Sequence, residues 1–392
     1  MISQPRIIIV GAGIVGLATA YALLKQGMRH VVVLEQETVA HRRGTSAGPS
    51  RLLRFEYGAD TFYSRMVQLS LNCWRSLQLV SGRTLYTPTG LLVLGTEDDG
   101  YTKTSYSTLR EMGLPTERLC AQGCQQRFPQ FATHPFGMVT YNSEAAILHA
   151  STCLHTLREL IIDLGGQIYE SCRVTHLTHE QQYRPVRLHV QSGEELTADR
   201  VVVAIGPWIH HLLSDLRLPV ELTRQYLLYF AGLSTAQFGV HHFPAFITQD
   251  LYGFPILSNP AGHGSGCLKA ASHKFGSSID PDDVPSIDEF IIAKTARRLR
   301  ALLPALQQAT LAHVDACMYD VTPDQDFILD HVPHDPRVVY ATGLTGHGFK
   351  FGLLLGELLS SLVCETPPAV PIERFRLARF AHRGLHAASS VA

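Results

Sequence analysis

A glycine-rich turn near the N-terminus separates a short apolar strand from a helix, and few folds accommodate this combination. Residues 6–10 are predicted as a buried strand, residues 11–16 read Gly-Ala-Gly-Ile-Val-Gly, and residues 14–26 have a helical pattern that stops at Gly27. A second apolar run follows at residues 31–34. Strand, helix and strand within about thirty residues predict a βαβ unit, whose parallel strands need a right-handed crossover.

The glycines of this turn, Gly11, Gly13 and Gly16, have the spacing of a dinucleotide-binding loop. The first permits the tight turn, the second lets the backbone approach a pyrophosphate, and the third lets helix and strand pack closely. The helix N-terminus offers unpaired N–H groups to the phosphates. Glu35 ends the second strand, where an acid accepts hydrogen bonds from ribose hydroxyls and disfavours NADP. The motif predicts a bound dinucleotide without separating FAD from NAD; a buried turn that needs glycines for steric reasons is the alternative.

The rest of the chain predicts an α/β fold in which a Rossmann-like cofactor domain is interleaved with a sheet-rich domain. Amphipathic helices are expected over residues 62–80, 151–164 and 286–303. In the first of them, one face carries Phe62, Met66, Leu69, Cys73, Leu77 and Val80. The third is expected to begin at a capping box formed by Ser286 and Glu289.

Strands dominate the middle of the chain and recur close to its end. The middle strands are expected over residues 186–190, 201–204, 225–230 and 311–319. A strand at residues 337–341, a glycine-rich turn and a helix from about Lys350 to Val363 repeat the opening motif. Both ends of the chain are therefore expected to build the cofactor domain.

Composition narrows the function classes. The 392 residues carry a formal net charge of −1, so a general nucleic-acid-binding surface is not expected. The eight cysteines are scattered and expected to be reduced thiols, and Cys120 and Cys124 lack the second pair that a zinc site needs, so no metal is predicted. Residues 7–24 lack the features of a signal peptide, and residues 389–392 are not a peroxisomal address, so the expected location is the cytoplasm.

Two segments near the C-terminus favour a flavin as the dinucleotide. Residues 316–324 read Ala-Cys-Met-Tyr-Asp-Val-Thr-Pro-Asp, and residues 343–351 read Gly-Leu-Thr-Gly-His-Gly-Phe-Lys-Phe. Gly346 and Gly348 keep side chains out of a turn, so that the backbone can approach a flat ligand. A helix N-terminus or the lysine at position 350 would stabilise the negative charge of a reduced flavin near N1 and C2=O.

With these motifs the chain resembles the monomeric sarcosine oxidase group of D-amino-acid-oxidase-like flavoproteins, which includes N-methyltryptophan oxidase and pipecolate oxidase. The resemblance covers nearly the whole chain. It rests on residues 11–16, Arg51-Leu52-Leu53-Arg54, Tyr252-Gly253-Phe254-Pro255, Leu268-Lys269, Cys317-Met318-Tyr319 and Gly346-His347-Gly348-Phe349-Lys350. Residues 243–246 and 375–380 look most like the N-methyltryptophan oxidase branch.

The resemblance implies an FAD-dependent amine oxidase. Such an enzyme converts the C–N bond of a secondary amino acid, N-methylated or cyclic, to an imine while O2 is reduced to hydrogen peroxide. The chain is expected to act as a monomer on a small amino acid, and which amine it oxidises stays open. We expect residues 1–80, 145–220 and 315–392 to form the FAD-binding domain, and residues 81–144 and 221–314 to form the substrate domain.

The resemblance also implies roles for individual residues. Cys317 matches the cysteine that carries FAD covalently through the flavin 8α-methyl group; on its own it is only a thiol near the end of a predicted strand. Lys269 matches the lysine that lies by flavin N5 and activates oxygen, although most lysines lie on the surface. The matches around the substrate and the flavin ring are Arg51, Arg54, Tyr252, His273, Tyr319, His347 and Lys350.

Among these matches, Arg54 and Lys350 are the expected clamp for the substrate carboxylate, because a guanidinium binds a carboxylate bidentately. Tyr252 and Tyr319 are expected to cover the carboxylate or an apolar side chain. His273 and His347 are expected to tune the protonation of the amine or the orientation of the substrate, although most of the twenty histidines must be structural or exposed.

The chain departs from the family just before its two arginines. Residues 44–51 read Gly-Thr-Ser-Ala-Gly-Pro-Ser-Arg where the family reads Ser-His-His-Gly-Asp-Thr-Arg, so both histidines and the aspartate are missing. Phe55 and Ala59 replace a usual histidine and acid, and the loop at residues 258–265 is longer. Two alternatives therefore stay open: a flavin dehydrogenase of the same fold with a non-oxygen acceptor, and a flavin-binding module without turnover.

Overall fold

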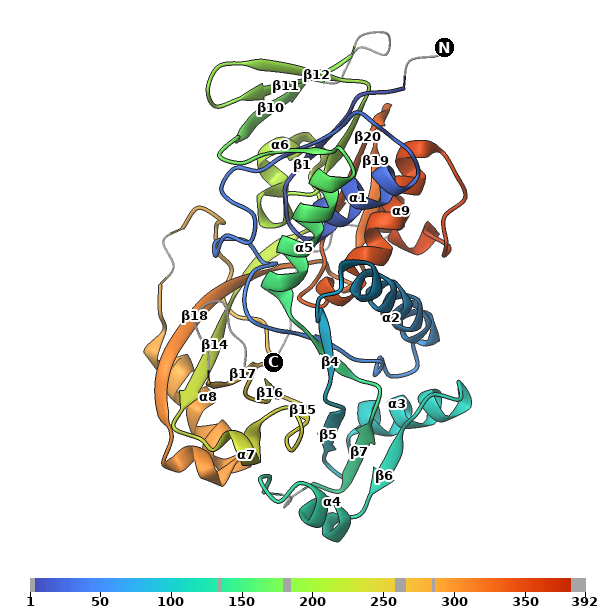
Figure 1. Cartoon of the computed structure of the whole chain (residues 1–392). Helices are drawn as coiled ribbons and strands as arrows, with labels where there is room; N and C mark the ends of the chain where they lie inside the picture. Colours follow the sequence, from blue (N-terminus) through green and yellow to red (C-terminus); the bar gives the residue numbers. More distant parts are fainter. Residues whose placement is uncertain (1–3, 133–135, 179–184, 258–265, 284–285, 382–392) are drawn as a thin grey trace.

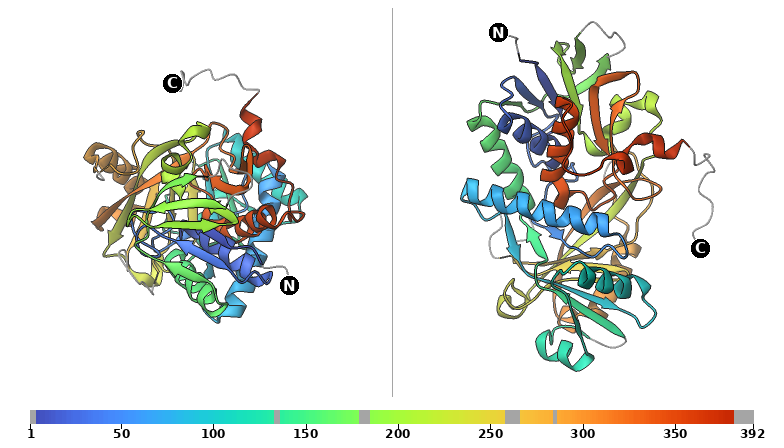
Figure 2. Two further views of the ribbon diagram at one scale, coloured as in Figure 1. Left: turned by 90° about the horizontal axis from the view of Figure 1, so that it is seen from above. Right: turned by 90° about the vertical axis from the view of Figure 1, so that its right-hand side faces the viewer.

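A computed structural model of the chain describes residues 4–132, 136–178, 185–257, 266–283 and 286–381. Two large sheets occupy opposite halves of the molecule, a mainly parallel one next to helices α1, α5 and α9 and a mainly antiparallel one that contains β14 and β18 (Figure 1). The side view in Figure 2 shows α2 (Thr61–Ser81) crossing between the two halves. Of the helices in the described part of the chain, none combines the length and the apolar character that a membrane span requires.

The first sheet is mainly parallel and has six strands. Their order is β19 (Ile328–Val332), β20 (Asp335–Thr342), β13 (Arg200–Val203), β1 (Ile7–Val10), β2 (Val31–Leu34) and β9 (Gln167–Tyr169). β1 and β2 are buried at every position, as expected for strands covered on both faces. Because β1 pairs in parallel with both β2 and β13, the strand order reverses there, and the carboxyl ends of these strands face a crevice where α/β sheets bind ligands.

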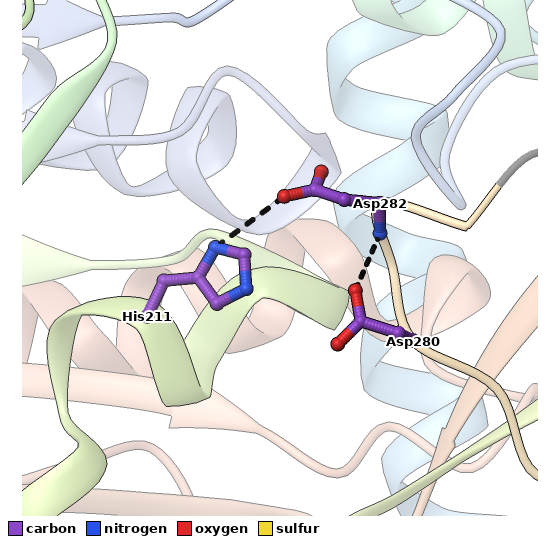
Figure 3. Close-up of side chains that lie close together, drawn as sticks. All are labelled: His211, Asp280 and Asp282. Carbon is purple, nitrogen blue, oxygen red and sulfur yellow. Dashed lines mark hydrogen bonds and ion pairs between the residues drawn. The ribbon is translucent and has the colours of Figure 1, made fainter.

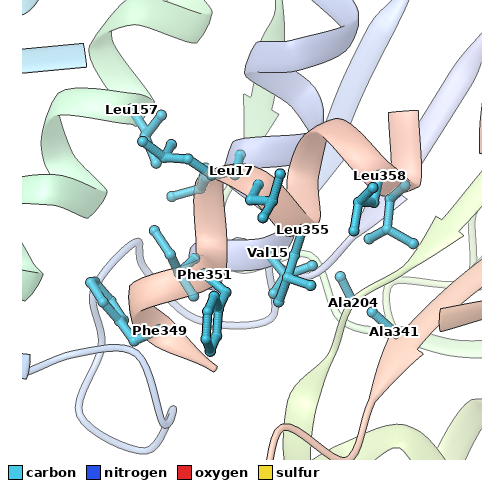
Figure 4. Close-up of a cluster of buried hydrophobic side chains, with 14 of the residues drawn as sticks. Val15, Leu17, Leu157, Ala204, Ala341, Phe349, Phe351, Leu355 and Leu358 are labelled. Carbon is cyan, nitrogen blue, oxygen red and sulfur yellow. The ribbon is translucent and has the colours of Figure 1, made fainter. Parts of the chain in front are cut away.

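Three helices cover one face of this sheet: α1 (Ile14–Lys25), α5 (Ala150–Asp163) and α9 (Gly352–Cys364). The predicted βαβ unit is confirmed, because α1 connects β1 to β2 and these two strands pair in parallel. Figure 4 shows their apolar side chains interleaved, including Val15, Leu157 and Leu355. A Cβ at Gly356 would lie 2.6 Å from the Cβ of Ala18, so the close approach of α1 and α9 requires a glycine. The opposite face carries an antiparallel sheet of β10 (Val174–Thr178), β11 (Val186–Val190) and β12 (Glu195–Ala198).

The second large sheet has eight strands. Their order is β18 (Thr310–Val321), β14 (Glu221–Ala231), β17 (Leu268–Ser272), β16 (Leu251–Phe254), β15 (Ala245–Thr248), β5 (Leu91–Gly95), β7 (Met138–Asn142) and β6 (Glu117–Leu119). The helices of this half are α3 (Gly100–Glu111), α4 (Ala121–Arg127), α7 (Thr235–Phe238) and α8 (Glu289–Leu302). A small sheet contains β3 (Arg51–Leu53), β8 (Ala146–Leu148) and β4 (Tyr86–Pro88). The domain boundary expected at residue 315 falls inside β18.

The predicted strands of the middle chain all exist, but they belong to three sheets. β13 joins the parallel sheet, β11 joins the small antiparallel sheet above it, and β14 and β18 form the long edge pair of the eight-stranded sheet. Strand patterns predict the extended backbone but not the partner, because pairing depends on residues far away in the sequence.

The predicted capping box at Ser286 is wrong. Helix α8 begins at Glu289, and its N-cap is Asp288, whose carboxylate accepts a hydrogen bond from the Ile291 N–H at 3.0 Å. Aspartate is as strong an N-cap as serine. Ser286 lies outside the helix, where its carbonyl accepts a hydrogen bond from the Tyr226 hydroxyl.

The apolar face predicted for the helix at residues 62–80 is only partly buried in α2. Leu69 and Val80 are 39% and 63% exposed, whereas Trp74 is completely buried. The Trp74 indole N–H donates to the Lys350 carbonyl at 2.8 Å, so the helix turns this face toward the segment that precedes α9. That segment is a 3-10 turn, η4 (Phe349–Phe351), and α9 therefore starts two residues later than the predicted helix.

Candidate active site

A first cavity, of about 510 Å³, lies at the carboxyl ends of β1, β2 and β13. Its wall includes residues 11–15 of the predicted dinucleotide-binding loop. Gly11 has φ +102°, and a Cβ there would clash with the Ala204 carbonyl oxygen, while a Cβ at Gly16 would clash with the Gly11 carbonyl oxygen. A Cβ at Gly13 would lie 3.3 Å from the Ser46 hydroxyl. Sterics therefore require glycine at positions 11 and 16, a side chain at position 13 would crowd Ser46, and the three glycines leave an open cradle at the N-terminus of α1.

The polar groups of this cradle are largely preorganised. The N-terminus of α1 has no cap from its own N-cap residue, and the Ile14 N–H donates to the Ser46 hydroxyl at 3.1 Å. Glu35 is buried; one carboxylate oxygen accepts from the Ala12 N–H at 2.8 Å and the other from the Glu37 N–H at 3.0 Å. An anion at this helix end would find N–H donors and a hydroxyl, and a diol would find the carboxylate of Glu35.

Sequence reasoning missed the residues that reach this cavity from distant segments. Trp208 and His211 line its wall after β13, and the Trp208 indole N–H donates to Asp282 at 2.9 Å. Asp282 also pairs with Arg43 at 2.8 Å, and Figure 3 shows it beside His211 and Asp280. The hydrogen bond from the indole, with nearby cations, lowers the pKa of Asp282. Asp282 therefore bridges two segments at the rim of the cavity. In the sequence, only the position of Trp208 just after a central strand could have indicated that it lies near the ligand.

A second cavity, of about 240 Å³, brings together most of the predicted site residues. It is lined by Arg51, Arg54, Tyr252, Lys269, His273, Cys317, Tyr319, Gly346, His347, Gly348 and Lys350. Ser46 and Leu344 line both cavities, so one elongated ligand can occupy both. The loop at residues 258–265, which was expected to reshape the entrance, lies outside the described residues.

Arg54 and Lys350 bring a guanidinium and a lysine amine to this second cavity. The Arg54 guanidinium donates to the Tyr101 hydroxyl at 2.8 Å, and that hydroxyl donates to the Glu56 carbonyl at 2.7 Å. The Lys350 ammonium donates to the Tyr57 hydroxyl at 2.9 Å. Burial, and then the charge of Arg54, lower the pKa of Lys350 well below its usual value. Among the described residues, neither Arg54 nor Lys350 forms an ion pair with a carboxylate. The guanidinium, with a lysine whose protonated form an anion would favour, creates a local preference for an anion.

His347 is tied into the same network. Its Nε2 lies 3.2 Å from the Gln325 carbonyl and therefore donates, so its Nδ1 accepts from the Tyr57 hydroxyl at 3.2 Å. Burial and Lys350 lower the pKa of His347 well below its usual value. His273 is different, because its Nε2 has no hydrogen-bond partner in the described part of the chain, and burial lowers its pKa to about 4. Both imidazoles are therefore neutral at neutral pH.

Lys269 is buried, which an average lysine is not. Its ammonium donates to the Ser50 carbonyl at 2.8 Å and lies 4.4 Å from the centre of the Phe254 ring. Burial, and then Arg51, lower the pKa of Lys269 well below its usual value. Arg51 itself donates to the carbonyls of Ser50, Thr45 and Ala47, so it fixes the loop that carries Ser46.

The aromatic wall comes from β16 and β18. The hydroxyls of Tyr252 and Tyr319 lie 3.3 Å apart. Gly346 has φ +69°, and a Cβ there would lie 2.5 Å from Cε2 of Tyr319, so this glycine serves the packing of the tyrosine ring. Cys317 lies two residues before Tyr319 on β18, and burial raises the pKa of its thiol to about 11, against the opposing effect of Arg51.

The chain is similar to known proteins over nearly its whole length. The family model described as FAD dependent oxidoreductase matches residues 6–362. The chain is 32% identical over 382 residues to peroxisomal sarcosine oxidase of Mus musculus, covering 95% of each chain. It is 27% identical over 383 residues to N-methyl-L-tryptophan oxidase of Yersinia pestis (strain Pestoides F), covering 95% of this chain and 99% of that one.

A solved structure supports the same fold. L-proline dehydrogenase from P. horikoshii superposes with a TM-score of 0.83 at 18% identity, covering 98% of this chain and 99% of that one. At this identity the similarity shows the fold alone.

Proposed function

Because the chain belongs to the family of FAD dependent oxidoreductases, we propose that it oxidises the C–N bond of a secondary amino acid, N-methylated or cyclic, to an imine with O2 as electron acceptor. The observation that carries this proposal is the second cavity, where Arg54 and Lys350 face an aromatic wall beside Lys269 and Cys317. The names of the relatives, sarcosine oxidase and N-methyl-L-tryptophan oxidase, support the substrate class.

The residues of the first cavity fit FAD. We propose that Gly11, Gly13 and Ser46 hold the pyrophosphate and that Glu35 holds the ribose, since these groups form an open cradle for an anion and a diol. The ring system would extend into the second cavity, where Cys317 would hold it through a thioether to its 8α carbon, formed with loss of the thiol proton, one methyl proton and two electrons that O2 accepts. When bound, FAD supplies the redox chemistry, taking two electrons from the substrate carbon and returning them to O2 with formation of hydrogen peroxide.

The domain division is part of this proposal. Residues 1–80, 145–220 and 315–392 would hold the cofactor, and residues 81–144 and 221–314 would cover the substrate. The two cavities support it, because the first is lined almost entirely by the former segments, while Tyr252 and Lys269 of the latter reach only the second.

Arg54 and Lys350 would bind the substrate carboxylate. Tyr101 holds the guanidinium of Arg54, and Tyr57 holds the ammonium of Lys350, so both donors are fixed before the substrate arrives. A bound carboxylate would raise the depressed pKa of Lys350, because an opposite charge favours its protonated form. Binding of the anion and protonation of this lysine would therefore reinforce each other.

The same positive charges select the neutral form of the amine. Arg51, Arg54 and Lys350 all line the cavity, so an ammonium group on the substrate would be repelled, and the amine is expected to bind after losing its proton. The free Nε2 of His273 can accept a hydrogen bond from that amine and so orient the carbon that is oxidised. Lys269 would favour electron transfer to O2 by placing positive charge where negative charge develops.

The test is a turnover experiment on the purified protein. Sarcosine, N-methyl-L-tryptophan, L-pipecolate and L-proline are added in turn, and hydrogen peroxide and oxygen consumption are followed. Peroxide from at least one of them supports the oxidase. Reduction of an artificial electron acceptor without oxygen consumption would replace it by the dehydrogenase, and no turnover with any of them would remove the enzymatic assignment.

Covalent attachment has a separate test. Acid precipitation is expected to leave yellow colour in the pellet of the wild-type protein and none in the pellet of the Cys317→Ser variant. Two narrower proposals, a monomer and a cytoplasmic location, are tested by light scattering and by cell fractionation.

A further inference from the structure

A third cavity, of about 690 Å³, lies beside strands β14 and β18 and shares Arg51 and Cys317 with the second cavity. Figure 1 shows these two strands running side by side along the edge of the eight-stranded sheet. We call this third cavity the Arg224 cavity. Its wall includes Arg42, Pro49, Arg224, Ile287, Val314 and Met318. The proposed oxidation uses none of these six side chains.

Arg224 is the unexplained group in this wall. It is only 5% exposed, its Nε has no hydrogen-bond partner among the residues that the structure describes, and no carboxylate of those residues forms an ion pair with it. A guanidinium nitrogen that is buried without an acceptor costs folding free energy, because burial removes its hydration. An anion in the cavity would remove this cost.

The acids that line the cavity are already engaged. Asp315 pairs with His313, Asp282 pairs with Arg43, and Asp283 accepts a hydrogen bond from the Asp280 N–H at 2.9 Å. Among the residues that the structure describes, none of these three carboxylates forms an ion pair with Arg224. Arg42, which is exposed in the same wall, adds further positive charge.

The cofactor does not supply the missing anion, a step that rests on the proposed function. Its pyrophosphate would lie at Gly11 and Gly13 in the first cavity, which Arg224 does not line. Across the β14–β18 pair, Gln225 lies opposite Cys317 and Arg224 opposite Met318. The end of the ring system next to Arg224 would thus be the end attached to Cys317, and that end carries no charge.

We propose that the Arg224 cavity is a second ligand site that binds an organic carboxylate with an apolar body, separately from the amino-acid substrate. Arg224 would pair with the carboxylate. The apolar walls of Pro49, Ile287, Val314 and Met318 would contact the rest of the molecule, and the volume, larger than that of the substrate cavity, suits more than a simple inorganic ion.

The test titrates the FAD-loaded protein with hexanoate and with its neutral analogue hexanamide, and follows binding by calorimetry. Hexanoate is expected to bind, and hexanamide about ten-fold more weakly or less, because it cannot pair with Arg224. Arg224→Met is expected to weaken hexanoate binding about ten-fold or more while the KM for the amino-acid substrate changes less than about two-fold. Arg54→Met is the matched control, with the opposite pattern: hexanoate binding kept and KM raised.

Equal hexanoate affinity in the wild-type protein and in Arg224→Met would overturn the inference. Loss of hexanoate binding in Arg54→Met alone would also overturn it, because that result would place hexanoate in the substrate cavity.

If Arg224→Met does not fold, Arg224→Lys and Arg224→Gln replace it. The lysine variant is expected to keep hexanoate binding and the glutamine variant to lose it, and equal affinities of the two variants would refute the site. A protein that binds hexanoate through Arg224 but turns over no amino acid would sink the proposed function and leave this site standing.

Discussion

Replacing Gly346 by alanine tests whether the glycine-rich turn shapes the active site through Tyr319. Gly346 has φ +69°, and the added Cβ would lie 2.5 Å from Cε2 of the tyrosine ring. The chain offers a matched control in Gly82, which has φ +64° at the C-cap of α2 and nothing within 4 Å of an added Cβ. The two substitutions thus share the backbone strain and differ in the steric contact.

The expected magnitudes follow from these geometries. An alanine in left-handed backbone costs about 1–2 kcal/mol, so Gly82→Ala should lower the free energy of unfolding by that amount and leave KM unchanged. Gly346→Ala should lose about 1–3 kcal/mol more, because overpacking must displace the Tyr319 ring. Its KM for the amino-acid substrate should rise, since the displaced ring is part of the cavity wall.

Urea unfolding of the FAD-loaded variants and steady-state kinetics measure both effects. A double-mutant cycle with Tyr319→Ala isolates the contact, because Gly346→Ala should then cost only the backbone strain. Equal losses of unfolding free energy in Gly346→Ala and Gly82→Ala would refute the steric argument, and so would a cycle without coupling.

Three further predictions concern the site. Arg54→Met should raise the KM for the amino acid about 10- to 150-fold, since a hydrogen bond to a charged group contributes about 1.5–3 kcal/mol. Tyr101→Phe should raise this KM less, because Tyr101 only holds the guanidinium of Arg54. Steady-state kinetics measure both effects, with the FAD content of each variant as the control. Asp282→Asn, placed in the Cys317→Ser background, should increase loss of FAD on dialysis, because it weakens the bridge at the rim of the first cavity; equal retention would exclude that role. Burial lowers the pKa of His273 to about 4 in the folded protein, against 6.5 in the unfolded chain, so the unfolded state binds more protons between these two pH values. Stability should therefore fall as the pH drops from 6.5 to 4. His273→Asn should make this fall smaller, as measured by the midpoint of urea unfolding.

The cofactor loop could be predicted from the sequence because its physics is local. Gly11, Gly13 and Gly16 act within one turn, and the strand before them and the helix after them are visible in the same short stretch. The family and the α/β fold expected from this turn and the later motifs are confirmed by the family model and by the superposed structure. The gathering of Lys269 and Lys350 in one cavity followed only from the resemblance, since periodicity does not report which distant segments meet.

The misses share a different cause. The buried face of α2 includes Trp74, whose hydrogen bond to the Lys350 carbonyl joins residues 276 positions apart in the sequence. Ser46 sits in a loop that reads only as a departure from the family, yet its hydroxyl meets the N-terminus of α1. Two features arise only when distant segments come together: the hydrogen bond of Arg54 to Tyr101, and the burial of the Arg224 Nε without a hydrogen-bond partner among the described residues.

The most direct test of the central claim is an anaerobic titration of the purified protein with matched pairs of amino acids. Each pair consists of a secondary amine and its primary counterpart, such as sarcosine with glycine and N-methyl-L-tryptophan with L-tryptophan. The account predicts that the visible flavin band bleaches with at least one secondary amine, does so far more slowly with its counterpart, and returns when O2 is admitted. A bound flavin that stays oxidised with every secondary amine, or that bleaches only with the primary counterparts, would contradict it.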